Sequence, residues 1–219
     1  DMSDGFRDFI RQAKPLRLKD PLAETLGAFT DEGAVLTYTF TDAVKLAGHA
    51  CPTVTGAYLA CQKALERLYP TEIPVRGEIA ITVYGEPDEG VYGVMAQVFN
   101  LLTGAAPATG FRGLGPKFKR KDLLKFDPRK PDPRALCFEF KRTDTGRSVL
   151  VKFHPHQIPF SEEKGRRMGE LLEKVIWEAA REEEKREFQE LWTEKVKDML
   201  LEQKDIDRWL TVEERRNQV

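Results

Sequence analysis

Apolar residues recur along the chain at two different spacings, which separate the predicted helices from the predicted strands. A repeat of three and four positions predicts helices over residues 6–13, 20–29, 41–47, 53–69 and 92–102. Residues 34–40 and 75–84 are rich in β-branched and aromatic side chains, and we expect strands there. Two further alternating runs, 135–142 and 147–154, flank a Thr-Asp-Thr-Gly turn and predict a β-hairpin.

The predicted helix 53–69 carries a single apolar stripe along one face. The stripe consists of Val54, Ala57, Cys61, Leu65 and Leu68. Cys61 belongs to it, so we assign this thiol to the core. Gly56 and Ala57 are small, and their face therefore admits either close packing of another element or a flat cofactor. We treat Gly56 as a candidate cofactor-binding residue.

The composition of the chain changes at Ser161. The segment from Ser161 to Val219 holds thirteen basic and seventeen acidic residues. Two apolar stripes at helical spacing run through it, separated by residues 181–187, which contain no apolar side chain. We therefore divide the chain into an α+β domain over 1–160 and a charged helical extension over 161–219. The extension is expected to wrap the core or to dock a second subunit.

Charge and composition exclude several classes of protein. The 219-residue chain balances 35 Lys and Arg against 36 Asp and Glu, so no overall basic field favours nucleic acid. No apolar stretch approaches the ~20 residues that span a bilayer. The residues after Met2 lack a signal-peptide pattern, and three scattered cysteines are typical of reduced thiols. These features predict a cytoplasmic protein.

A long connection rich in Gly, Ala and Pro follows the predicted helix 92–102. Loops of this length, here residues 103–115, are usually functional or disordered. The connection lacks the Gly-Lys-Ser/Thr signature of a phosphate loop, but Gly110 and Gly113 are candidate cofactor-binding residues. A basic cluster comes next: Lys117, Lys119, Arg120 and Lys121. Such a cluster is suited to contact an anionic cofactor, a partner or nucleic acid, but aromatic residues are sparse within it, which favours a solvated charged loop.

Two pairs of residues carry candidate metal chemistry. His49 and Cys51 lie in the run Gly48-His49-Ala50-Cys51-Pro52, at the predicted mouth of a helix. Imidazole and thiolate suit borderline-soft metals, and a helix N-terminus favours the thiolate. His154 and His156 are two positions apart, which places both rings on one face of an extended chain. Each pair alone leaves a tetrahedral site incomplete.

The segment from residue 42 to about residue 155 resembles the FmdE family, whose name comes from a component of formylmethanofuran dehydrogenase. The motif Gly-His-x-Cys-Pro at 48–52, the small-residue helix with Gly56 and Tyr58, and the order of the later elements carry the resemblance. Val94 and Ala105 stand where the family often has cysteines. The resemblance implies an α+β fold with helices packed on a mixed sheet, His49 and Cys51 as metal ligands, a homodimer, and a redox or molybdenum/tungsten enzyme as partner.

Three functions fit these features. The leading interpretation is a protein that binds zinc, iron or haem through His49 and Cys51, with His154, His156 or a second chain completing the shell. The second is a thiol-dependent or metal-dependent enzyme that uses Cys51 and His49. The third is a non-catalytic subunit or adaptor that docks through the helical extension.

Overall fold

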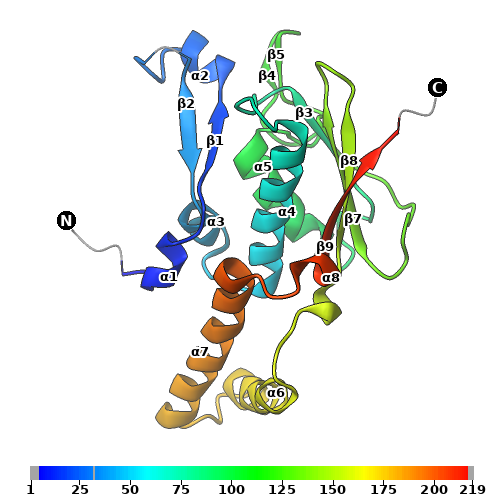
Figure 1. Cartoon of the computed structure of the whole chain (residues 1–219). Helices are drawn as coiled ribbons and strands as arrows, with labels where there is room; N and C mark the ends of the chain where they lie inside the picture. Colours follow the sequence, from blue (N-terminus) through cyan, green and yellow to red (C-terminus); the bar gives the residue numbers. More distant parts are fainter. Residues whose placement is uncertain (1–4, 32, 217–219) are drawn as a thin grey trace.

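A mixed five-stranded sheet lies at the centre of the fold in a computed structural model that describes residues 5–31 and 33–216 (Figure 1). The strand order is β6-β3-β7-β8-β9; β3 runs parallel to β6, and all other neighbours are antiparallel. The strands are β3 Ile79–Val83, β6 Leu124–Phe126, β7 Leu136–Arg142, β8 Ser148–Phe153 and β9 Leu210–Arg215. The predicted α+β class with a mixed sheet and helices packed on it is confirmed, as is the β-hairpin.

Two helices, α4 Pro52–Leu68 and α5 Tyr92–Thr103, pack against each other and cover one face of this sheet (Figure 1). Apolar side chains at alternating positions along the strands form the buried surface of that face. Phe138 and Phe140 of β7 both point into the core, where Phe99 of α5 meets them edge to face at 5.0 and 5.1 Å between ring centroids. Cys61 of α4 is completely buried, as predicted, and this burial raises the pKa of its thiol.

The N-terminal part forms a two-stranded ribbon beside the sheet. Its elements are α1 Asp8–Arg11, β1 Leu16–Lys19, α2 Pro21–Thr25, β2 Val35–Tyr38 and α3 Phe40–Ala47. The strand predicted to reach Phe40 ends at Tyr38 because Thr39 caps α3: its amide donates to the Asp42 carboxylate at 2.8 Å. β1 has only four residues, too few for its alternating pattern to predict a strand.

The C-terminal segment begins as predicted, with a charged helical extension. Its helices α6 Glu162–Ile176 and α7 Glu182–Lys197 form a hairpin that projects from the sheet (Figure 1). The π-helical turn η2 Asp198–Glu202 and the short α8 Ile206–Trp209 lead back to the core. The last element, β9, was not predicted: it pairs with β8 along its whole length. Three of its six residues are charged, so the segment lacks the apolar alternation that predicts a strand and was included in the helical extension.

No helix in the described part of the chain combines the length and the apolar character needed to cross a bilayer.

Candidate functional site

The predicted His–Cys motif forms the link between α3 and α4. Gly48 ends α3 in the left-handed region at φ +78°, and Cys51 is the N-cap of α4, where its Sγ accepts a hydrogen bond from the Val54 amide at 3.4 Å. His49 is exposed, and its Nδ1 lies 3.1 Å from the Ala47 carbonyl oxygen. Because a carbonyl only accepts, Nδ1 carries the proton in this contact, and Nε2 is left to bind a proton or a metal.

The second predicted pair, His154 and His156, flanks Pro155 at a turn that packs against α4. The two rings meet edge to face, with centroids 5.8 Å apart and planes at 71°. The predicted extended backbone is wrong here, because the 3₁₀ turn η1 Pro155–Gln157 begins between the two histidines. The rings therefore contact each other and do not stand side by side on a strand.

The two pairs do not add up to a metal centre within one chain. Among residues 5–31 and 33–216, no group of three or more His, Cys, Asp or Glu side chains is placed to hold a metal ion. A zinc site needs three or four protein ligands. The residues present therefore do not fit a zinc or iron shell built from a single copy, and the metal prediction requires ligands from elsewhere.

Gly56 serves helix packing and leaves no room for a cofactor. A Cβ atom at this position would overlap the Phe153 ring of β8. The glycine thus lets α4 approach the sheet closely, and the ring fills the space in which a flat cofactor was expected. The prediction of Gly56 as a cofactor-binding residue is wrong for this reason.

The Gly-rich loop, residues 103–115, lines a cavity of about 740 Å³ between α2, α3, α5 and the small hairpin of β4 Gly113–Leu114 and β5 Phe118–Lys119. Gly113 forms part of the wall, whereas Gly110 does not, and its amide donates to the Pro107 carbonyl of the same loop at 3.1 Å. The role of both glycines in cofactor binding stays a prediction. The charged side chains of the wall are Asp20, Arg76, Arg112 and Arg120, and we call this space the arginine cavity.

One carboxylate in the arginine cavity holds two guanidinium groups. Arg76 Nε donates to Asp20 Oδ2 at 2.8 Å, and Arg120 Nη2 donates to Asp20 Oδ1 at 2.6 Å. Oδ1 also accepts hydrogen bonds from the amides of Leu22 and Ala23, because Asp20 is the N-cap of α2. Burial alone would raise the pKa of Asp20, but the hydrogen bonds and the two positive charges outweigh it and hold this pKa below its ordinary value.

Positive charge in the arginine cavity exceeds negative charge. Arg120 is 4% exposed, and burial lowers the pKa of its guanidinium despite the nearby Asp20. Its Nη1 is buried and finds no hydrogen-bond acceptor in the described part of the chain. Arg76 is partly compensated, since its Nη1 donates to the Leu101 and Leu102 carbonyls at the negative end of α5. The third arginine, Arg112, is exposed on the Gly-rich loop.

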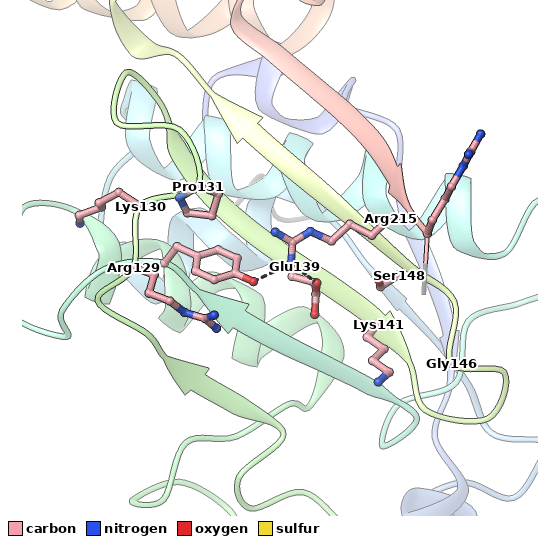
Figure 2. Close-up of a pocket in the computed structure, with 10 residues that line it drawn as sticks. Arg129, Lys130, Pro131, Glu139, Lys141, Gly146, Ser148 and Arg215 are labelled. Carbon is pink, nitrogen blue, oxygen red and sulfur yellow. Dashed lines mark hydrogen bonds and ion pairs between the residues drawn. The ribbon is translucent and has the colours of Figure 1, made fainter. Parts of the chain in front are cut away.

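A second cavity, of about 620 Å³, lies on the face of the sheet opposite α4 and α5 (Figure 2), and three of the five cations in its wall are paired with carboxylates. Figure 2 shows Arg215 beside Glu139, and the two side chains form a hydrogen-bonded ion pair at 2.6 Å. Arg129 pairs with Asp127 at 2.6 Å, and Lys130 pairs with Glu89 at 3.0 Å. Lys141 and Arg216 complete the positive charge of this wall, but unlike the arginine cavity it contains, among the described residues, no buried side-chain nitrogen without a hydrogen-bond acceptor.

Sequence reasoning missed most of the arginine cavity. The pattern of the basic cluster favours a solvated loop, and this prediction is wrong for Arg120 because its side chain is buried against Gly77 and Gly104. A Cβ on Gly104, whose φ is +74°, would lie 2.5 Å from Arg120 Nη1. The one available signal was Gly104, two positions after the predicted helix 92–102, because a glycine there marks a tight helix end where another chain segment can approach.

Comparison with known proteins adds no family to these observations: no protein-family model and no curated protein sequence matches the chain.

Proposed function

We propose that this protein binds a small organic anion in the arginine cavity. The observation that carries the proposal is the imbalance of charge in its wall, where three arginines face a single carboxylate. A buried cation is costly unless an opposite charge or a set of acceptors compensates it. A carboxylate or phosphate group in the cavity would supply both the missing charge and acceptors for the guanidinium N–H groups.

Binding fits this site better than catalysis does. Asp20 accepts hydrogen bonds from four donors, the two arginines and the amides of Leu22 and Ala23, so its oxygens are already engaged. The lowered pKa of Asp20 also makes it a weak base. Burial raises the pKa of Tyr38, the phenol in the wall, and keeps it protonated. The volume of about 740 Å³ lies within the range typical of small-molecule sites.

Calorimetric titration with inorganic phosphate and with acetate tests the proposal. We expect the Arg120→Gln variant to bind both probes at least tenfold more weakly, since a hydrogen bond to a charged group contributes about 1.5–3 kcal/mol. Arg112→Gln, at an exposed position, should weaken binding a few-fold without disturbing the fold. Arg129→Gln is the matched control, an arginine outside the cavity that is paired with Asp127.

Unchanged affinity in both cavity variants would contradict the proposal, and so would a wild-type protein that binds neither probe. Circular dichroism of each variant separates a lost site from a lost fold.

A metal shared between two copies of the chain is the second candidate. The exposed His49 with its available Nε2 and the half-exposed Cys51 thiol favour it, because both groups are accessible to ligands from a partner. The predicted homodimer, the redox or molybdenum/tungsten enzyme partner and the cytoplasmic location belong to this candidate. It does not extend to a haem beside Gly56, where Phe153 fills the space.

Elemental analysis, a visible spectrum and the molar mass of protein purified without chelator test the shared metal. We expect metal in the wild type and its loss in both His49→Ala and Cys51→Ser, because removing one of so few ligands weakens a site strongly. Wild-type protein that is free of metal, or metal content unaffected by both substitutions, would rule the second candidate out.

A further inference from the structure

The rim of the arginine cavity is apolar and exposed, in contrast to its charged interior. Four side chains of the rim are exposed to solvent: Leu26 by 65%, Leu46 by 44%, Phe111 by 85% and Leu114 by 51%. They are four of the nine large hydrophobic side chains that are exposed in the described part of the chain. Exposed apolar residues scattered singly are ordinary, but a group around one opening marks a binding surface.

These four residues reach the rim from different parts of the sequence. Leu26 ends α2, Leu46 lies in the last turn of α3, and Phe111 and Leu114 belong to the Gly-rich loop and β4. Three separate segments therefore turn apolar side chains toward the same opening. Leu46 is exposed although Ala43 and Val44 on the same helix are buried.

We propose that the ligand of the arginine cavity is an amphipathic anion, with a carboxylate or phosphate head and an apolar chain or ring. This inference rests on the proposed function. The head lies against Arg76 and Arg120 in the interior, and the apolar part extends along Leu26, Leu46 and Phe111 toward solvent. The charge of the interior complements the head, and the rim complements the apolar part, so a small inorganic anion satisfies only half of the site.

The chain length of the ligand provides the test. Acetate, butyrate, hexanoate and octanoate are titrated against the wild type, together with monoalkyl phosphates of matching length. Full burial of one methylene strengthens binding about fourfold, so we expect hexanoate to bind at least tenfold more tightly than acetate. The better of the two series identifies the head group.

Phe111→Ser separates the rim from the interior. Phe111 is 85% exposed, so its replacement should leave the fold intact. We expect hexanoate binding to weaken about tenfold while acetate binding is unchanged. Trp177→Ser is the matched control, because Trp177 is an aromatic residue of similar exposure, 75%, just after α6 and outside the cavity. It should alter neither affinity.

The outcomes distinguish this inference from the function on which it rests. If acetate and phosphate bind but affinity does not rise with chain length, the apolar part of the proposal is wrong and the anion site stands. If affinity rises with chain length but Arg120→Gln has no effect, the anion site is wrong. If Phe111→Ser lowers the molar mass of the protein and leaves affinity unchanged, the rim is a subunit interface, which overturns the inference.

Discussion

Replacing Asp20 with asparagine is expected to lower the free energy of unfolding by about 3–5 kcal/mol. Asp20 is 7% exposed and is the counter-charge of both Arg76 and Arg120. Asparagine still caps α2, so the helix start is preserved. The loss therefore reports the missing counter-charge of the buried Arg120 and the partly buried Arg76. Chemical denaturation at neutral pH measures the change.

The pH dependence of this loss follows from the lowered pKa of Asp20. A carboxyl group whose pKa is lower in the folded state stabilises the fold above its unfolded pKa of about 3.9, and this contribution is lost as the pH falls through the folded value. The difference between wild type and Asp20→Asn should therefore be constant above about pH 5 and shrink in more acidic solution. A difference that grows on acidification would contradict the assignment.

Asp127→Asn is the matched control for this experiment. Asp127 also pairs with an arginine, Arg129, at 2.6 Å, but that guanidinium is 76% exposed. Water replaces the carboxylate there, so stability should be almost unchanged. Equal effects of the two substitutions would show that the arginine cavity is not the buried, charged site described above.

Replacing Trp209 with alanine is expected to cost about 3–5 kcal/mol of stability. Trp209 is 1% exposed, meets Phe153 edge to face at 6.4 Å between ring centroids, and donates Nε1 to the Lys204 carbonyl at 3.0 Å. It directly precedes β9, so its loss should also free that strand from β8. Denaturation gives the energy, and hydrogen exchange of the β9 amides shows the release of the strand.

Trp177→Ala tests whether the effect belongs to the buried position. Trp177 is 75% exposed, and its removal should leave both stability and exchange unchanged. Full protection of the β9 amides in Trp209→Ala would mean that pairing with β8 alone holds the strand.

Long elements with a regular apolar spacing were predictable from the sequence. The stripe of α4, including Cys61, and the hairpin of β7 and β8 were predicted correctly, because both run over enough residues for the period of the apolar positions to show. Strands such as β4, β5 and β6 contain only two or three residues and are too short for any period to show. Their positions depend on pairing with distant segments.

The arginine cavity could not be predicted for a related reason. Asp20 lies 56 positions from Arg76 and 100 positions from Arg120 along the chain, and no local pattern connects residues so far apart. Folding brings them together at the end of α5. By contrast, the His–Cys motif is local and was easy to recognise, but its two residues are not joined by further ligands within the described part of one chain. The His–Cys motif was therefore recognisable because its residues are adjacent in the sequence. The excess of positive charge in the arginine cavity is visible only in the folded structure, because its residues are far apart in the sequence.

The position of β9 in the chain has a consequence for biosynthesis. β8 is complete at Phe153, but the strand that covers its outer edge begins at Leu210, after residues 154–209 have been made. At typical elongation rates this interval lasts roughly 3–11 s. During it, an apolar strand with an open edge leaves the ribosome and is exposed to other nascent chains, so this edge is the place where chaperones would engage.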